Sequence, residues 1–454
     1  MHRIILITVL AIFSIHGFAQ DISGDWMGTL PIRDTELDFG FHITKNENSY
    51  STLVSVPQQG PTDMDVKTTL FVGDTLKIAD PTLQLEYTGV MVANEFEGNI
   101  TLGAQTFPLV LKKGKIALNR PQEPKAPFSY YSEEVTFMNK TDKIALKGTL
   151  TLPKKRGKFP LAIIISGSGP QNRDGAVFGH KPYHVIADHL TNNGVAVLRF
   201  DERGVGESEG DFATAAIDEF TSDIHAAVAY AKSRKEIKVS KIGLIGHSIG
   251  GIIAPKVAAA NADIGFLVLL AGPGVNGDQL MLSQKAASER IMGVSEFAIA
   301  QGQQLMKGGY DIIVASEMEI PKLKDSINSF YLKTYGNFIP ENQRNRLVDQ
   351  ITGHEFVSLI KSKPSTALSK VKCPVLALNG SKDFQVPAKD NLAAIKQALE
   401  ENGNTNVKTV ELEQLNHLFQ ECATGAKSEY AEIEQTIAPA VLELITEWVT
   451  EQTK

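Results

Sequence analysis

The sequence has few cysteines: two among 454 residues, with only two tryptophans beside them. Cys373 precedes a predicted strand, whereas Cys422 follows another, which places the two thiols at opposite edges of a sheet. A six-residue strand spans about 20 Å, but bridged Cα atoms lie within about 7 Å of each other. We therefore expect two free, mostly buried thiols, and neither cysteine has the spacing of a metal ligand.

Clusters of basic residues are also absent. The chain has 52 acidic and 45 basic side chains, a formal net charge of −7, which argues against nucleic acid as a partner. Gly204-Val205-Gly206 is only a fragment of a dinucleotide-binding fingerprint, so no cofactor is expected. No carboxylate–histidine spacing indicates a metal, and we expect four histidines to be solvated on helices: His180, His184, His189 and His225.

The amino terminus has the pattern of a secretory signal. A basic start, Met1-His2-Arg3, precedes an apolar run over residues 4–15 and a small-x-small motif, Gly17-Phe18-Ala19. The run is too short for a permanent membrane span, and no cysteine follows the cleavage site for lipid attachment. We expect a signal peptide over residues 1–19 and an exported protein, periplasmic or extracellular, with no stable membrane anchor. A retained anchor is the alternative.

The rest of the chain divides into three regions by its pattern of apolar and polar residues. Residues 20–116 contain short alternating runs separated by turns, which predict a small antiparallel β domain. Residues 117–130 contain three prolines and are expected to form a stiff linker. From residue 131 to 454 strands and helices alternate, which predicts an α/β domain with a mainly parallel, doubly wound sheet.

The predicted strands of this α/β domain begin with an antiparallel pair over 135–137 and 144–152. The parallel strands are expected at 161–165, 195–200, 242–246, 266–271, 374–379 and 407–412. A mostly helical insertion at about 275–368 interrupts the alternation and is expected to form a cap. We expect its aromatic residues to lie mostly in its core, with one or two lining a pocket: Phe297, Tyr310, Phe330, Tyr331, Tyr335 and Phe338.

Gly246-His247-Ser248-Ile249-Gly250 lies between an apolar strand and a predicted helix. A Gly-x-Ser-x-Gly turn in this context is a nucleophile elbow, which exposes the serine hydroxyl at the strand end. The expected oxyanion hole combines the Ile249 N–H with a donor from the Gly-rich loop after residues 161–165, either Ser168 or Gly167.

Two further residues complete the expected site. Asp383 follows the strand at 374–379, and His417 follows the strand at 407–412. The order Ser, Asp, His is that of a catalytic triad on such a sheet. Histidine accepts the serine proton, and the aspartate holds the imidazole in the required tautomer. Asp201 and Arg203 are expected to brace the loop after residues 195–200 rather than to react.

Several separated motifs, in order, resemble the α/β-hydrolase superfamily over about residues 130–452. They are residues 166–175, 200–208, 246–251, 378–383 and 415–420. More closely, they are similar to bacterial exported serine hydrolases grouped with prolyl-oligopeptidase-like or acetyl-xylan-esterase-like proteins. The resemblance implies hydrolysis of carboxylic esters with Ser248, Asp383 and His417 as the triad. The absence of a His-Gly-Gly-Gly loop argues against the lipase branch.

The sequence therefore predicts an exported serine esterase without cofactor or metal, which forms an acyl-enzyme on Ser248. Small-molecule esters of small to medium acyl groups are the expected substrates, and acylated sugars are one option. A peptidase acting on short peptides is the first alternative, although the β region is too short for a propeller filter. A non-catalytic glycan- or envelope-binding protein is the second. Neither the natural substrate nor the oligomeric state follows from the sequence.

Overall fold

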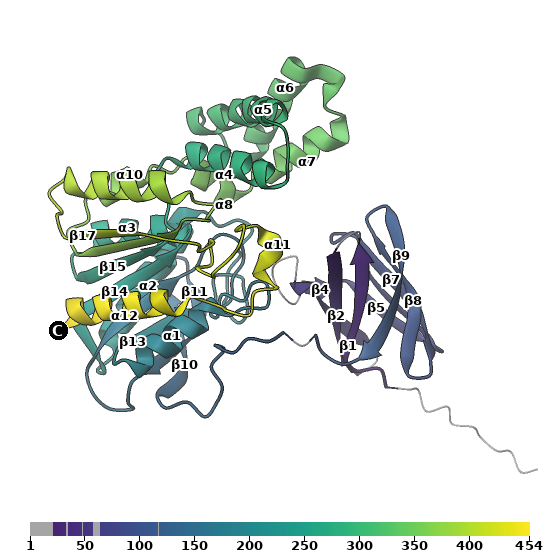
Figure 1. Cartoon of the computed structure of the whole chain (residues 1–454), viewed down its shortest axis with the longest axis horizontal. Helices are drawn as coiled ribbons and strands as arrows, with labels where there is room; N and C mark the ends of the chain where they lie inside the picture. Colours follow the sequence, from purple (N-terminus) through teal and green to yellow (C-terminus); the bar gives the residue numbers. More distant parts are fainter. Residues whose placement is uncertain (1–20, 33–34, 48, 58–63, 117) are drawn as a thin grey trace, which may run out of the picture. The chain divides into compact units, whose positions relative to one another are not determined.

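The computed structural model describes residues 21–32, 35–47, 49–57, 64–116 and 118–454. The chain forms two compact units, Met1–Ala117 and Leu118–Lys454, each visible in Figure 1. The predicted signal peptide lies outside the described residues. Within those residues, no helix has the length and apolar character needed to cross a bilayer.

The first unit is a nine-stranded antiparallel sheet with the spatial order β4-β3-β2-β1-β9-β8-β7-β6-β5. Its strands are β1 Gly24–Ile32, β2 Thr35–Lys45, β3 Tyr50–Ser55, β4 Met64–Val66, β5 Thr68–Val72, β6 Thr75–Asp80, β7 Leu85–Val92, β8 Glu95–Leu102 and β9 Gln105–Lys113. The Thr69 hydroxyl in β5 donates to Thr52 in β3 at 2.8 Å. Because this bond joins elements near the two ends of the sheet, the sheet curls around its core.

Trp26 is part of that core. Its side chain is buried, its indole N–H donates to the Ile22 carbonyl at 2.8 Å, and its ring lies 4.7 Å from the ring of Phe96. A buried tryptophan whose N–H is satisfied stabilises packing. The expected β domain is confirmed, with Trp26 as a core residue.

The second unit contains an eight-stranded sheet in the order β10-β11-β13-β12-β14-β15-β16-β17. Its strands are β10 Tyr131–Asn139, β11 Ile144–Leu152, β12 Phe159–Ile165, β13 Ala196–Phe200, β14 Ile237–His247, β15 Ile264–Leu270, β16 Val375–Gly380 and β17 Val407–Leu412. β10 and β11 are antiparallel, and β12 to β17 run parallel. The sheet is that of an α/β-hydrolase, as predicted.

Alternate residues of β12 show how the sheet is covered on both faces. Leu161 and Ile163 pack into the core cluster under α2, α3 and α10, whereas Ala162 and Ile164 pack into the cluster under α1 and α12. The helices are α1 Pro182–Asn192, α2 Ile217–Ser233, α3 Gly250–Ala260, α10 Ala388–Glu400, α11 Lys427–Tyr430 and α12 Pro439–Thr453. Both faces of a parallel sheet must be buried in this way.

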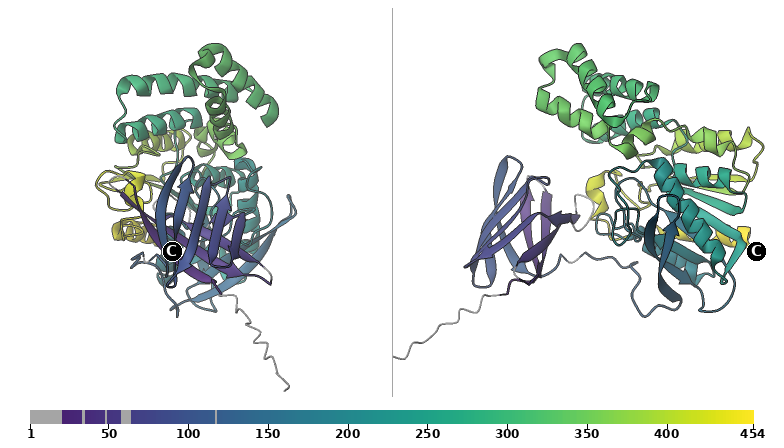
Figure 2. Two further views of the ribbon diagram at one scale, coloured as in Figure 1. Left: turned by 90° about the vertical axis from the view of Figure 1, so that its right-hand side faces the viewer. Right: turned by 180° about the vertical axis from the view of Figure 1, so that it is seen from behind.

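A helical cap lies between β15 and β16, at the position predicted for the insertion. It comprises α4 Gly277–Ile291, α5 Glu296–Ala315, α6 Ile320–Tyr335, the short helix η2 Gly336–Phe338, α7 Glu341–Ile351, α8 His354–Ile360 and α9 Pro364–Leu368. Figure 2 shows most of these helices gathered apart from the layers around the sheet. Tyr310 and Tyr331 are buried in the cap core, but Phe297 and Phe338 are 77% and 96% exposed. For these two residues the expected burial was wrong, because their positions face away from the packed side of the cap.

The segment before β10 is bound to the second unit. Arg120 is buried, and its guanidinium donates to the carbonyls of Ala431 at 2.6 Å and Ile433 at 3.1 Å. The Gln122 amide donates to the Ile437 carbonyl at 2.7 Å. Residues 118–130, which make up most of the linker predicted over residues 117–130, therefore belong structurally to the second unit.

Two expectations about side chains need correction or refinement. His180 is not solvated, since it is only 1% exposed. Its ring nitrogens lie 2.9 Å from the Thr436 hydroxyl and 2.9 Å from the Tyr430 carbonyl. Burial lowers the pKa of His180 to about 4. Cys373 and Cys422 are free, as expected, but both are half-buried rather than buried.

Candidate active site

Ser248 lies in a tight turn between β14 and α3. Its backbone has φ 53°, a left-handed conformation that costs a non-glycine residue about 1–3 kcal/mol. A Cβ on Gly246 would lie 2.2 Å from the Gly250 carbonyl oxygen, and one on Gly250 would lie 2.6 Å from the Ile165 oxygen. Both glycines are therefore required by close backbone approach, and the turn has the geometry of a nucleophile elbow.

Asp383 and His417 are brought together from the ends of β16 and β17. His417 Nδ1 lies 2.7 Å from Asp383 Oδ2, and both side chains are buried. The other carboxylate oxygen accepts the backbone N–H groups of Gln385 at 2.8 Å and Val386 at 3.0 Å. Because a carboxylate only accepts hydrogen bonds, Nδ1 carries the proton, and Nε2 of the neutral ring is the nitrogen able to accept another.

The turn that carries His417 is held by its own side chains. The Asn416 side-chain oxygen accepts the N–H groups of Leu418 and Gln420, each at 3.0 Å, and Phe419 adopts φ 62°. Asn416 is completely buried. These bonds fix the backbone on either side of His417 and thereby the direction of its imidazole.

His247, the second residue of the elbow motif, links the elbow to the His417 turn. Its Nε2 lies 3.1 Å from the His417 carbonyl oxygen, and the two rings are 4.9 Å apart. Desolvation lowers the pKa of His247 to about 3, so its ring is neutral at pH 7 and Nε2–H donates to that carbonyl. The Gly-x-Ser-x-Gly motif alone does not predict that His247 links the elbow to the His417 turn.

The loop after β12 lies against the elbow. A Cβ on Gly167 would be 3.3 Å from Ser248 Cβ, which shows how closely the two segments approach. The Gly167 N–H donates to the Tyr183 hydroxyl at 3.0 Å, so that group is already engaged. Ser168, the other predicted loop donor, lines one cavity together with Ile249 and Ser248.

That cavity, the catalytic pocket, has a volume of about 330 Å³. Its polar lining includes Gln284, Glu355, Gln385 and Lys427. Its apolar walls come largely from cap helices α4 and α8 and are formed by Pro273, Leu280, Met281, Phe356, Leu359 and Val386. None of the six cap aromatics singled out from the sequence lines it; Phe356 does.

Two half-buried carboxyl groups, Glu355 and Glu202, bracket the loop after β12. Glu355 in cap helix α8 accepts the Gly169 N–H with both oxygens at 3.3 Å, and Glu202 accepts the Gln171 N–H at 2.9 Å. Burial raises the pKa of both groups, and the nearby Glu355 carboxyl further raises that of Glu202. Neither Glu355 nor Glu202 is recognisable as part of the site from the sequence.

Asp201 and Arg203 have the bracing roles predicted for them. Asp201 binds the Arg173 guanidinium through both carboxylate oxygens, at 3.1 Å and 2.6 Å, and accepts the Arg173 N–H at 2.7 Å. Arg203 donates to Asp223 at 2.7 Å. The charge-assisted bonds between Asp201 and Arg173 hold the loops after β12 and β13 to each other, and the bond between Arg203 and Asp223 ties the loop after β13 to α2.

Comparison with known proteins shows which family this architecture belongs to. The family model described as serine aminopeptidase, S33, matches residues 179–421, more than half of the chain and the part that carries Ser248, Asp383 and His417. The chain belongs to this family of α/β-hydrolases. Membership fits the elbow, the order of the strands and the position of the cap.

Three relatives illustrate the similarity. Esterase EstD of Thermotoga maritima is 27% identical over 274 residues, which cover 60% of this chain and 58% of EstD, less than two thirds of its length. An uncharacterized 31.7 kDa protein of Escherichia coli, from the traX-finO intergenic region, is 26% identical over 252 residues, 54% of this chain and 80% of that protein. A solved Pyrococcus furiosus esterase aligns with a TM-score of 0.44 and 17% identity, covering 75% of this chain and 98% of that one.

Proposed function

We propose that this S33-family hydrolase cleaves carboxylic esters through an acyl-enzyme on Ser248. The observation that carries the proposal is the 2.7 Å bond between His417 Nδ1 and Asp383, because it fixes the tautomer that a general base needs. The second support is the left-handed elbow at Ser248, in the same cavity as Ile249 and Ser168. The name of the relative EstD agrees with an esterase.

In this mechanism His417 Nε2 removes the Ser248 hydroxyl proton while Oγ attacks the ester carbonyl carbon. The carbonyl oxygen becomes an oxyanion, which the N–H groups of Ile249 and Ser168 stabilise. His417 then returns the proton to the departing alcohol oxygen, which leaves an acyl group on Oγ. Water, deprotonated by His417, attacks the acyl carbonyl carbon and forms a second tetrahedral intermediate. The bond from this carbon to Ser248 Oγ then breaks and His417 returns the proton to Oγ, which releases the acid and restores Ser248.

The catalytic pocket supports small to medium acyl groups as substrates. Its volume of about 330 Å³ lies near the lower end of the range for small-molecule sites, about 300–1,000 Å³. Apolar residues of the cap, such as Met281 and Phe356, would contact the acyl or alcohol portion. Acylated sugars remain one option for the alcohol portion.

A peptidase acting on short peptides is the second candidate, and the description of the family as serine aminopeptidases favours it. Ester and amide cleavage use the same nucleophile and base. The two candidates therefore differ in substrate, and a direct comparison of substrates separates them.

The test compares the wild-type chain with Ser248→Ala on nitrophenyl esters of increasing acyl length and on a panel of peptide anilides. We expect ester turnover to fall by about 10⁴-fold or more in the variant. Ser233→Ala is the matched control, since Ser233 is exposed at the end of α2. Equal ester turnover in all three proteins would contradict the proposal, and anilide turnover alone would favour the peptidase.

We also propose export, on the pattern of residues 1–19. Expression of the full chain in a bacterial host should yield mature protein that begins at Gln20 and leaves the cytoplasm. Amino-terminal sequencing of the purified protein tests this directly. An intact Met1 on a cytoplasmic protein would contradict it.

A further inference from the structure

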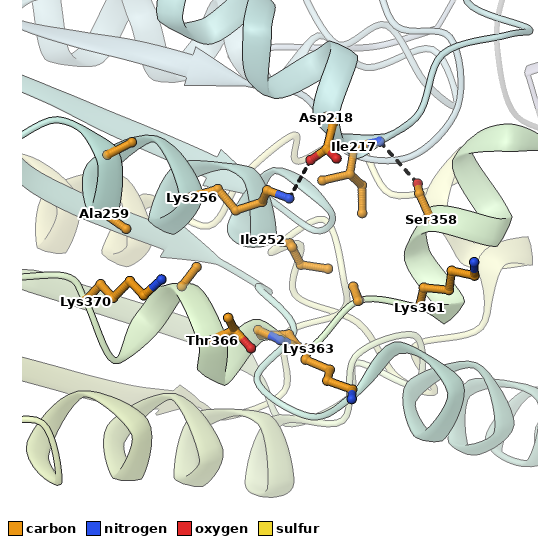
Figure 3. A pocket seen from close by; sticks show the side chains of 14 residues that line it. Ile217, Asp218, Ile252, Lys256, Ala259, Ser358, Lys361, Lys363, Thr366 and Lys370 are labelled. Atoms are coloured by element: carbon orange, nitrogen blue, oxygen red, sulfur yellow. Dashed lines mark hydrogen bonds and ion pairs between the residues drawn. The ribbon is translucent and has the colours of Figure 1, made fainter. Parts of the chain in front are cut away.

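A second pocket lies in the second unit at the base of the cap (Figure 3). It has a volume of about 620 Å³ and is formed by α2, α3 and the segment from α8 to just beyond α9. No residue lines both this pocket and the catalytic pocket. We call it the lysine pocket, after Lys256, Lys361, Lys363 and Lys370, which line it.

The charge of the lysine pocket is opposite to that of the chain. Four lysines and one carboxylate, Asp218, give it a formal charge of +3, whereas the whole chain has −7. Lys256 is paired with Asp218 at 2.6 Å. Lys361 donates to the Ser316 carbonyl and lies 3.8 Å from Glu317.

The ammonium groups of the other two lysines of the pocket, Lys363 and Lys370, make no hydrogen bond or ion pair within the described part of the chain. Both side chains are exposed and come from the two ends of the α9 segment, as Figure 3 shows. Each therefore provides a separate positive charge at the rim of the pocket.

Between these charges the pocket is mainly apolar. The apolar residues that line it are Ile217, Ile252, Ala259, Ala260, Pro364 and Ala367. An inorganic anion would pair with the lysines but leave the apolar surface exposed to water. A hydrocarbon would cover that surface but form no ion pair with the lysines. The lining therefore matches a ligand with both an apolar body and a negative head.

We propose that the lysine pocket binds an amphipathic carboxylate, with its alkyl or aryl body on the apolar lining and its carboxylate at the rim that carries Lys363 and Lys370. A carboxylate needs only the compact positive charge that a lysine offers. The volume of about 620 Å³ is well within the range of small-molecule sites. This binding site does not depend on the proposed esterase function.

Helix α8 connects this site with the catalytic pocket. Ser358, whose hydroxyl oxygen accepts the Ile217 N–H at 3.1 Å, lines the lysine pocket, and Glu355 and Phe356 on the same helix line the catalytic pocket. A ligand in the lysine pocket therefore contacts the helix that forms a catalytic wall. On the proposed function, which releases a carboxylic acid, such a ligand belongs to the product class and would change turnover through α8.

The test measures octanoate binding by isothermal titration calorimetry to three full-length proteins: wild type, Lys363→Glu/Lys370→Glu, and the control Lys154→Glu/Lys158→Glu. The control lysines are exposed in the loop before β12 and give the same charge change. We expect wild type and control to bind octanoate equally and the pocket variant to bind at least tenfold more weakly. The neutral variant Lys363→Met/Lys370→Met should lose affinity as well, without the repulsion of a reversal.

Two further ligands define the chemistry. 1-Octanol and inorganic phosphate should each bind wild type at least tenfold more weakly than octanoate does. Equal octanoate affinity in all four proteins would overturn the proposal, as would the absence of binding to wild type. Phosphate binding as tight as octanoate binding would overturn the amphipathic assignment.

Coupling is measured separately, as the effect of octanoate on hydrolysis of a nitrophenyl ester. An effect through the lysine pocket should be present in wild type and absent from Lys363→Glu/Lys370→Glu, whereas competition in the catalytic pocket would affect both proteins alike. An identical effect in both would overturn the coupling. If neither protein hydrolyses the ester, the esterase proposal fails and the calorimetric result stands by itself.

Discussion

Removing the Glu355 carboxyl should slow catalysis without weakening substrate binding. Glu355 reaches from the cap to accept the Gly169 N–H, with both oxygens at 3.3 Å, next to the proposed oxyanion donor Ser168. A hydrogen bond to a charged group contributes about 1.5–3 kcal/mol, and the long distance favours the lower value. Since about 1.4 kcal/mol corresponds to a factor of ten in rate, Glu355→Ala should lower kcat about tenfold and leave KM nearly unchanged.

Glu355→Gln is the matched control, because its amide oxygen can still accept the Gly169 N–H. It should retain kcat within about fivefold of wild type, since a neutral acceptor still supplies about 1 kcal/mol. Steady-state kinetics on a nitrophenyl ester, with melting temperatures recorded for all three proteins, separates the cases. Equal loss in both variants, or a change confined to KM, would refute the positioning role of Glu355.

Three other changes follow from the structure. Asp383→Asn should lower kcat about 10⁴-fold with little change in melting temperature, because the histidine tautomer is lost; near-normal kinetics would exclude Asp383 from the triad. Gly250→Ala should lower the free energy of unfolding in urea by about 2 kcal/mol or more, because its Cβ would lie 2.6 Å from the Ile165 oxygen. Gly353→Ala, whose Cβ would meet nothing within 4 Å, should lower it by less than about 0.5 kcal/mol. Equal losses in the two variants would refute the packing argument. Burial raises the Glu202 pKa above its ordinary 4.5, so the native state keeps this proton to a higher pH than the unfolded chain does. The stability that the bound proton contributes is present below pH 4.5 and is lost as pH rises through the raised value. Glu202→Gln should therefore gain stability relative to wild type as pH rises above 4.5 in urea titrations, and a difference that does not change with pH would contradict the raised pKa.

The features predictable from sequence are those that local pattern determines. The apolar strand before the elbow, the tight Gly246–Gly250 turn and the helix after it adjoin in the chain, and the structure places them as β14, turn and α3. The same holds for Asp383 and His417, each of which directly follows a strand of a parallel sheet. Because parallel strands end at one edge, their order was enough to expect these two side chains in one site, and the structure places His417 Nδ1 2.7 Å from Asp383 Oδ2.

The missed features depend on residues far apart in the chain. Glu355 meets the Gly169 N–H across 186 positions, and Arg120 meets the Ala431 carbonyl across 311. An isolated glutamate in a cap helix has the pattern of a solvated face, and a proline-containing segment has the composition of a linker. No local periodicity encodes such contacts, since they depend on how complete elements pack.

Labelling of Ser248 tests the central claim most directly. The wild-type protein, Ser248→Ala and the control Ser233→Ala would each be incubated with a fluorophosphonate and analysed by intact and peptide mass spectrometry. The account predicts one adduct per chain in wild type and control, located on Ser248, and none in Ser248→Ala. An adduct on another residue, or equal labelling of Ser248→Ala, would contradict the assignment of Ser248 as the nucleophile.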